Sequence, residues 1–523
     1  MKKLILASVS AAAMLAAGAA FAADNTSTLN QPGNSNSATV DQSGGSYGDS
    51  LINQNGDDNK ANVTQSGNDG KSTVTQDGTN GKVTVIQNRN QDLFFPAAGT
   101  GDSNVSTVTQ AVGTDGAKAS VSQLGELNTS DVQQNASNVK ASVDQTGIYN
   151  HSYVNQDATG GTVDVTQVGD PATGGPGVGE GDNLSTVNQY SGADGSKATV
   201  MQTSTGTNGY PSNTSLIDQY APDSVADVTQ SGDENVSNVL QQGSNGGKAV
   251  VDQDGYNNLS NITQTGNGAS QNKANVKQSG QNQDSEVVQT GSGLTAKVDQ
   301  QNDTNYSNVL QTATDSSAYV TQIGVTNDSY VTQTGAGNSA KVTQGNATDP
   351  NSTVSNLSTV DQNGYNGKVV VAQGTDGAYS ENWGNTSDVN QDGDGNSAKV
   401  TQKNHENVST VNQNVGYTAG VTNNKATVAQ SGDYNTSLVN QGSVELAAAN
   451  NTASVDQQAS YSYSEINQEG DGNTASVVQI GSLQNSTINQ LGDSNIASVS
   501  QSGSGNVSLV NQLGNGNVAS VTQ

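Results

Sequence analysis

The amino-acid sequence predicts an all-β protein, a parallel β-solenoid of about 20 stacked rungs, each rung a β-arch of two strands. The triplet aliphatic-x-Gln recurs 40 times, from Leu29-Asn30-Gln31 to Val521-Thr522-Gln523, and 27 of the 39 intervals between copies are 11 residues. The residue two before the aliphatic alternates between Ser and Ala or Val without a break, so the full repeat is 22 residues long. Within each copy only alternate positions are fixed, which is the period of a strand with one buried face.

The first residues are expected to form a secretory signal peptide. Lys2 and Lys3 precede an apolar stretch, and Ala20-Phe21-Ala22 supplies the small-x-small pattern of a cleavage site. We therefore divide the chain into a signal peptide, residues 1–22, and a solenoid, residues 23–523. The apolar stretch is too short to span a bilayer and no later segment is apolar enough, so we expect export through the periplasm and no membrane span.

Each half of the repeat is expected to be one strand. In the segment from Asn506 to Gly514, the fixed residues are the Asn, Ser508, Val510, Gln512 and the Gly. This set is expected to face inward. Asn and Gly tolerate left-handed backbone angles, so we expect both to bound the strand and begin a tight turn. All seven prolines fall outside the strand cores, where proline would remove a ladder hydrogen bond.

Stacking of identical units predicts in-register ladders in two parallel sheets, the cross-β geometry formed by a single chain. About 20 rungs at about 4.8 Å give a rod of roughly 95 Å. Buried amides avoid a desolvation penalty when each donates to the next rung and accepts from the previous one. The residues expected to represent this core ladder are Ser27, Leu29, Gln31, Ala38, Val40, Gln42, Ser486, Ile488, Gln490, Asn495, Ala497, Val499, Gln501, Asn506, Ser508, Val510, Gln512, Asn517, Ala519, Val521 and Gln523.

Twelve longer intervals are expected to be loop insertions, because the Ser and Ala alternation continues across each of them. Strands with Ser two residues before the aliphatic are called Ser-type, and those with Ala or Val there are called Ala-type. The insertions add 44 residues after Ala-type strands and 19 after Ser-type strands, so one edge of the rod is expected to carry most of the loops. One insertion carries Leu93-Phe94-Phe95-Pro96. The principal insertions lie near residues 88–103, 168–182, 203–212, 345–355, 374–384, 414–424 and 442–450.

Composition excludes several classes of function. With 47 acidic and 18 basic residues the chain carries a net charge of -29 and has no basic patch in its sequence, which argues against nucleic acid as a partner. There is no cysteine, and the two histidines, His151 on a strand and His405 in a turn, are far apart in the sequence. We therefore predict that the protein is not an enzyme and has no cofactor or metal site.

The two ends of the repeat array carry the functional inference. A solenoid that stays monomeric needs atypical capping repeats, because an exposed terminal rung is an unpaired β edge. Only Ala23 and Asp24 lie between the expected cleavage site and the first strand, which is expected to begin at Asn25, and the last repeat runs to Gln523. A Ser-type strand is first and an Ala-type strand is last, so the sequence predicts head-to-tail addition of further copies into an open filament.

The repeat Ser-x-Val-x-Gln-x-Gly-x-x-Asn-x-Ala-x-Val-x-Gln resembles the curlin repeat of curli, the bacterial extracellular functional amyloid. The segment from Ser486 to Gln501 shows it almost in full, and the resemblance covers residues 25–523. It implies a secreted fibre subunit at the cell surface, for biofilm matrix and adhesion, exported by a dedicated outer-membrane pore and assembled on a minor nucleator subunit. Curlin subunits usually have fewer repeats and a Gly/Asn-rich leader, so this chain is interpreted as an expanded form without that leader.

An alternative interpretation is a monomeric secreted or surface-displayed solenoid adhesin whose inserted loops bind a partner. Deletion of the insertions at residues 88–103 and 168–182 separates the two hypotheses, because fibre formation would survive it and loop-mediated adhesion would not. An enzyme on a β-helix scaffold is a more distant alternative, since no cluster of acid, base or metal-ligand residues is found.

Overall fold

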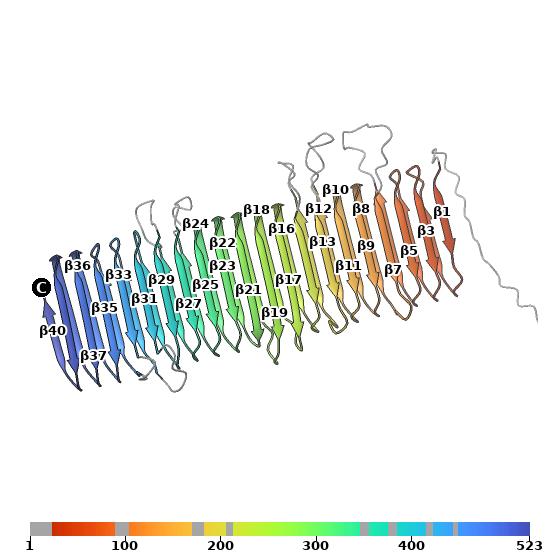
Figure 1. The fold of residues 1–523 in the computed structure, drawn as a ribbon. Coiled ribbons are helices and arrows are strands. Elements are labelled where there is room, and N and C mark those ends of the chain that lie inside the picture. The colour runs from red at the N-terminus through yellow and green to blue at the C-terminus, as the bar shows by residue number, and fades with distance from the viewer. Residues whose placement is uncertain are drawn as a thin grey trace, which may run out of the picture.

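The structure is a computed structural model that describes residues 24–88, 104–169, 183–204, 213–345, 355–374, 384–414, 422–442 and 448–523. These residues form 40 strands and no helix. Figure 1 shows one elongated rod in which the order of strands along the axis is the order along the chain, from β1 to β40. The predicted fold class, a parallel β-solenoid of stacked two-strand rungs, is confirmed.

The odd-numbered strands are the Ser-type strands and form one 20-stranded sheet. Each pairs in parallel with the next odd-numbered strand, as β1 does with β3 and β37 with β39. Their bounds are β1 Thr26–Asn30, β3 Asp49–Gln54, β5 Lys71–Gln76, β7 Val105–Gln110, β9 Thr129–Gln134, β11 His151–Gln156, β13 Leu184–Gln189, β15 Thr214–Gln219, β17 Val236–Gly243, β19 Leu259–Gly266, β21 Asp284–Gly291, β23 Tyr306–Gln311, β25 Asp328–Gln333, β27 Leu357–Gln362, β29 Thr386–Gln391, β31 Val408–Gln413, β33 Thr436–Gln441, β35 Tyr463–Glu469, β37 Asn485–Leu491 and β39 Val507–Leu513.

The even-numbered strands are the Ala-type strands and form the second sheet, a parallel ladder from β2 to β40. Their bounds are β2 Ser37–Asp41, β4 Lys60–Gln65, β6 Lys82–Asn88, β8 Lys118–Glu126, β10 Lys140–Ile148, β12 Thr162–Val168, β14 Lys197–Thr203, β16 Val225–Asp233, β18 Lys248–Tyr256, β20 Lys273–Gln281, β22 Thr295–Asp303, β24 Ser317–Val325, β26 Ser339–Gln344, β28 Lys368–Gln373, β30 Ser397–Gln402, β32 Lys425–Gln430, β34 Thr452–Gln457, β36 Thr474–Ser482, β38 Ile496–Ser504 and β40 Val518–Thr522.

The register stacks identical positions on one another. In the pairing of β37 with β39, Ser486 lies beside Ser508, and Ile488 lies beside Val510. The register also holds across insertions, since Val165 of β12 pairs with Val200 of β14 and not with Val187. A slip of one residue would turn every core side chain to the solvent face, so the buried set fixes the register.

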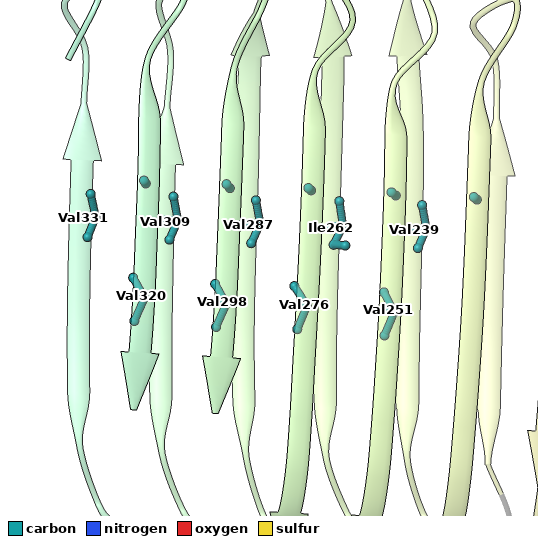
Figure 2. Packing of buried hydrophobic residues seen from close by; sticks show 14 of the residues in the cluster. Val239, Val251, Ile262, Val276, Val287, Val298, Val309, Val320 and Val331 are labelled. Atoms are coloured by element: carbon teal, nitrogen blue, oxygen red, sulfur yellow. The ribbon is translucent and has the colours of Figure 1, made fainter. Parts of the chain in front are cut away.

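The space between the sheets is filled by one continuous apolar cluster, which runs from Ile52 to Val510 and contains only Val, Ile and Ala. Figure 2 shows valines of the two sheets in two facing rows, among them Val251 and Val276 of the even sheet and Val239 of the odd sheet. Branched side chains suit this pleated and fully buried surface. Because the rows repeat at every rung, few aliphatic residues are enough to build a core along the whole rod.

The turns correct one expectation of the sequence analysis. Many of the glycines two residues after the Gln have a positive φ, such as Gly255 at 126°. The fixed asparagines do not: the residues with positive φ are their neighbours, Leu127 before Asn128 and Tyr149 before Asn150. The expectation that Asn is fixed for its left-handed backbone was therefore wrong, and its side chain has to explain its recurrence.

Several predictions concern residues outside the described ranges. These are the signal peptide, the Leu93-Phe94-Phe95-Pro96 segment and nearly all of the seven insertions. The strands on either side of the insertions are described; β6 ends at Asn88 and β7 begins at Val105. Among the described residues, no helix has the length and apolar character needed to cross a membrane.

Candidate functional site: the polar ladders and the terminal rungs

Each sheet carries one unbroken glutamine ladder. In both sheets the Nε2 of every core Gln except the last donates to the Oε1 of the Gln in the next rung, at 2.5 to 3.0 Å, giving 19 such bonds per sheet. The odd ladder runs from Gln31 to Gln512, and the even ladder runs from Gln42 to Gln523. Both ladders have the same direction, with every donor aimed toward the C-terminal end of the rod.

A second set of bonds fixes this direction and joins the two sheets. Gln264 of the odd sheet donates to the carbonyl oxygen of Lys248 across the core at 3.1 Å, and Gln253 of the even sheet donates to that of Val236 at 3.0 Å. A carbonyl oxygen can only accept, so the amide nitrogen has to lie on that side. The amide orientation therefore repeats at every rung, and the ladder has a donor end and an acceptor end.

The fixed asparagines form a shorter ladder at the turns. Asn128 donates from Nδ2 to Asn104 Oδ1 at 3.2 Å and to the carbonyl oxygen of Gly147 at 2.9 Å, while its backbone N–H donates to Asn104 Oδ1 at 3.0 Å. Asn150 repeats the pattern on Asn128. The asparagine side chain thus satisfies buried backbone groups where one turn stacks on the next. The sequence analysis expected the asparagine amides to bond from rung to rung, and it did not predict their bonds to the backbone of the turns.

The core serines behave differently. In every odd strand from β3 to β39 the serine hydroxyl is buried and has no hydrogen-bond partner among the described residues. Stacked hydroxyls about 4.8 Å apart are too distant to bond directly, because an O–H···O bond is about 2.7–2.8 Å long. The serine column therefore differs from the glutamine ladder, although Ser recurs in every odd strand as regularly as Gln does.

The predicted core-ladder residues divide by their place along the rod. Those of β37 and β38 and the residue before β38 are buried: Ser486, Ile488, Gln490, Asn495, Ala497, Val499 and Gln501. In the penultimate strand β39, Ser508, Val510 and Gln512 are buried, and Asn506 just before it is half-buried. In and around the last strand β40, Asn517, Ala519 and Val521 are half-buried and Gln523 is exposed. At the other end Ser27, Leu29 and Gln31 are exposed, and Ala38, Val40 and Gln42 are half-buried.

The terminal rungs present open ladder ends. Gln31 Oε1 and Gln42 Oε1 accept no hydrogen bond from the described residues, whereas the Oε1 of every later core Gln does. At the opposite end, Gln512 Nε2 donates only to the carbonyl oxygen of Ile496 and Gln523 Nε2 only to that of Val507. Among the described residues, the acceptors at one end of the rod and the donor hydrogens at the other end are thus left without partners.

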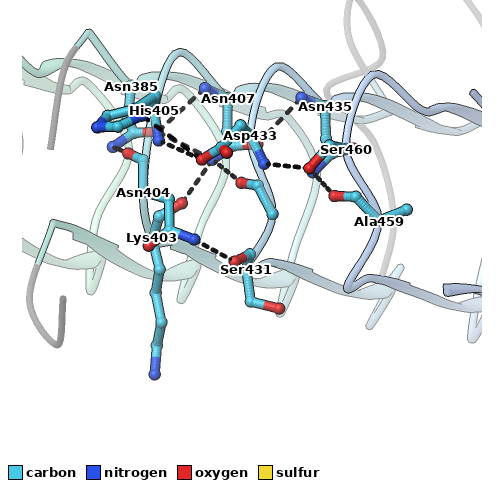
Figure 3. A network of polar contacts seen from close by, with 11 residues as sticks. Asn385, Lys403, Asn404, His405, Asn407, Ser431, Asp433, Asn435, Ala459 and Ser460 are labelled. Atoms are coloured by element: carbon cyan, nitrogen blue, oxygen red, sulfur yellow. Dashed lines mark hydrogen bonds and ion pairs between the residues drawn. The ribbon is translucent and has the colours of Figure 1, made fainter. Parts of the chain in front are cut away.

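The histidines are not brought together with each other. His151 is the first residue of β11 on the outer face of the odd sheet. His405 lies in a turn with its Nδ1 3.6 Å from Asp433 Oδ1, beside the bond from Asn404 Nδ2 to the carbonyl oxygen of Ser431 at 2.6 Å (Figure 3). Among the described residues, no group of three or more His, Cys, Asp or Glu could hold a metal ion.

Several carboxylates on the outer face of the odd sheet are partly desolvated. Burial raises the pKa of Asp328, which lies between Tyr306 and Leu357 of the neighbouring strands. Burial also raises the pKa of Asp284, with the nearby charge of Glu286 as a smaller cause. The same cause raises the pKa values of Asp361 and Asp388.

The comparison with known protein families identifies these repeats. The model of the curlin associated repeat matches residues 313–345 and 492–523. The chain therefore contains curlin associated repeats. The two matched segments lie in stretches of regular rungs, and the other rungs of the rod stack on them in the same register. The resemblance inferred from sequence is therefore confirmed. No curated protein matches the chain.

Proposed function

We propose that this curlin-repeat protein is the structural subunit of an extracellular curli-like fibre that serves biofilm matrix and adhesion. Proteins with curlin repeats are in general extracellular, and a self-assembling subunit is what the family suggests. Growth is head-to-tail: the β1/β2 rung of one copy stacks on the β39/β40 rung of another. Export through a dedicated pore and growth from a nucleator subunit extend the proposal by family resemblance.

The main observation that supports the proposal is the direction of the glutamine ladders. A ladder whose donors all aim one way ends in a donor at one tip and an acceptor at the other, so two copies are complementary only head to tail. Gln512 would donate to Gln31 of the next copy, and Gln523 would donate to Gln42. Each new junction then continues both amide ladders and both backbone ladders, as in a cross-β stack of separate chains.

The apolar core also favours head-to-tail stacking. Leu29 in the first rung is 46% exposed, whereas Ile52, its neighbour in the second rung, is fully buried. Stacking on another copy would place Leu29 against Val510 and Val40 against Val521, which covers the open end of the core. Removing this apolar surface from water favours the junction, at roughly 25 cal/mol per Å².

The experiment starts from monomeric chain lacking residues 1–22 at micromolar concentration. We expect unbranched fibres by electron microscopy and a meridional reflection near 4.8 Å in fibre diffraction, because every strand lies across the fibre axis. A chain that stays monomeric for days without this reflection contradicts the proposal. Sheared fibres added as seeds should shorten the lag phase, since they supply preformed terminal rungs.

A loop-deletion variant separates the fibre from the adhesin alternative. Removing residues 90–101 and 171–181 restores the 11-residue interval at both places, since the intervals there are 23 and 22 residues. The variant should form fibres at the rate of the intact chain. A variant that forms fibres but no longer binds cells would assign adhesion to the loops, and one that forms none would contradict assembly through the rungs.

A further inference from the structure

The two outer faces of the rod differ in charge. Each strand has three outward positions that precede its core Gln and alternate with its core residues. On the even sheet these positions hold 13 lysines and seven aspartates, whereas on the odd sheet they hold one lysine and nine acidic residues. At these positions the even face is thus net basic, on a chain whose total charge is -29.

The lysines are concentrated in one column. Nine even strands begin with lysine, namely β4, β6, β8, β10, β14, β18, β20, β28 and β32, and no even strand begins with an acidic residue. Lys60, Lys82, Lys118 and Lys140 stack directly on one another in four successive rungs. Like charges at this spacing repel each other, so the column is an unfavourable arrangement for the isolated rod.

These lysines are available to a partner. All 13 side chains are exposed, and none lies within 4.0 Å of a carboxylate among the described residues. On the opposite face the acidic residues lie among apolar side chains, such as Asp284 between Leu259 and Tyr306. The odd face therefore combines negative charge with apolar surface, and the even face supplies the complementary charge.

The two faces also match in shape and spacing. Both belong to sheets of one rung period, so the lysines of β4 to β32 can follow an acidic face from rung to rung without losing register. A face roughly 90 Å long and about 18 Å wide offers about 1,600 Å², and a stable interface needs about 800 Å² on each partner. Two sheets packed face to face lie about 10 Å apart, within reach of lysine side chains.

We infer that rods of this protein associate side by side, with the lysine-rich even face of one copy docked on the acidic odd face of a second copy. The contact is heterologous, so each pair leaves one free even face and one free odd face, and further rods can add to make a ribbon. Side-by-side association does not depend on head-to-tail growth, since it uses the sides of the rod and not its ends.

Mass per length, measured by scanning transmission electron microscopy, tests this inference. Head-to-tail growth lengthens a rod without changing mass per length, whereas side-by-side association multiplies it. The mass of one chain lacking residues 1–22 per roughly 95 Å is the value for a single rod, and we expect at least twice that value at physiological salt. If the chain forms no fibres, the same measurement on short rods still tests the inference.

The test variant changes four lysines to glutamine, K60Q, K82Q, K118Q and K140Q. We expect the protein concentration at which half of the rods are associated to rise at least tenfold, with fibre length unchanged. The control adds the same change of net charge, four negative charges, to the face that is already acidic: T28E, T73E, T186E and T410E. It should associate as well as the unmodified chain or better.

Three results would overturn the inference. The first is a mass per length of a single rod for the unmodified chain. The second is association of the four-lysine variant as strong as that of the unmodified chain. The third is a loss of association in the control as large as in the four-lysine variant, which would show that net charge matters and not the face that carries it. Binding of single rods to heparin, lost in the four-lysine variant, would assign the basic face to a polyanion instead of a second copy.

Discussion

At the scale of single residues, the core separates two kinds of polar side chain. A core glutamine such as Gln264 has partners on three sides: it accepts from Gln241 and donates to Gln289 and to the carbonyl oxygen of Lys248. A core serine such as Ser260, on the same strand, is equally buried and its hydroxyl has no partner among the described residues. Equal recurrence in sequence therefore does not mean equal contribution to stability.

Two substitutions in β19 test this difference. Gln264→Met keeps the length of the side chain but leaves the buried Gln289 Oε1 without its donor, so we expect a loss of about 1–3 kcal/mol in the free energy of unfolding. Ser260→Ala removes a hydroxyl that is buried without a partner, so we expect no loss or a small gain. Guanidinium unfolding midpoints measure both, and a larger loss for Ser260→Ala than for Gln264→Met would contradict this account.

At the scale of strands and turns, backbone contact between stacked turns decides where glycine is required. A Cβ on Gly492 would lie 2.4 Å from the carbonyl oxygen of Gly514 in the next rung. A Cβ two residues further along the same turn is tolerated, since Ser494 occupies that position with a φ of 59°. The strands show a similar contrast: their core positions are nearly invariant, whereas their outward positions vary and carry the half-buried carboxylates of the odd face.

These carboxylates predict a pH dependence. Burial raises the folded-state pKa values of Asp284, Asp328, Asp361 and Asp388. The folded state then binds more protons than the unfolded state between the two pKa values, so these residues make the free energy of unfolding rise as pH falls through the raised values. They make it lowest above that window, where all four are ionised.

Unfolding midpoints of the intact chain and of the double variant Asp284→Asn, Asp328→Asn, compared from pH 7 to pH 4, measure this effect. The double variant should be more stable at pH 7 and should gain less on acidification. Asp49→Asn removes an exposed charge from the same face and is the control. If the control flattened the pH profile as strongly as the double variant, burial would not be the cause.

At the scale of the whole molecule, an end rung differs from an interior rung because it has no neighbouring rung on one side. Gly514 has the backbone of Gly492, with φ of 96° and 114°, but no backbone of a following rung lies within 4 Å of its Cβ position. In a head-to-tail fibre the turn after β1, which contains Gly33, would take that place. A substitution of Gly514 is therefore expected to affect the free rod and the fibre differently.

Gly514→Ala should leave the monomer folded, with the modest loss expected for a side chain at positive φ, and should lower the fibre elongation rate at least tenfold. Gly516→Ala is the matched control: its φ is also positive, at 70°, but a Cβ on Gly472, the corresponding glycine two rungs earlier, meets only the Ser494 hydroxyl at 3.7 Å. Elongation from preformed seeds, followed with an amyloid dye, distinguishes the two. Equal rates would show that the turn after β39 is not covered in the fibre.

The sequence by itself determined the strands, the 22-residue unit, the register and the parallel solenoid. It could do so because a period-2 pattern repeated at every rung admits one in-register stack, in which a slip exposes the whole core. The fixed positions of the repeat also identified the residues that stack from rung to rung. Composition alone would have indicated disorder, since aliphatic residues are few; their placement in two facing rows between the sheets reverses that conclusion.

The sequence also predicted that stacked amides bond from rung to rung, but only the tertiary structure decided the direction of these bonds and their backbone partners. The direction of the glutamine ladders depends on carbonyl groups of the facing sheet, such as that of Lys248, which sequence spacing does not orient. Asn128 was expected both to adopt a left-handed backbone and to bond along the stack; its backbone is not left-handed, and its side chain also bonds to the backbone of Gly147 and Asn150 in the neighbouring rung. The separation of Lys60 and its column from the acidic odd face also becomes visible only when alternate strands are assigned to opposite sides of the rod. Periodicity specifies which residues stack, whereas bonds and charged faces depend on atoms brought together across the core.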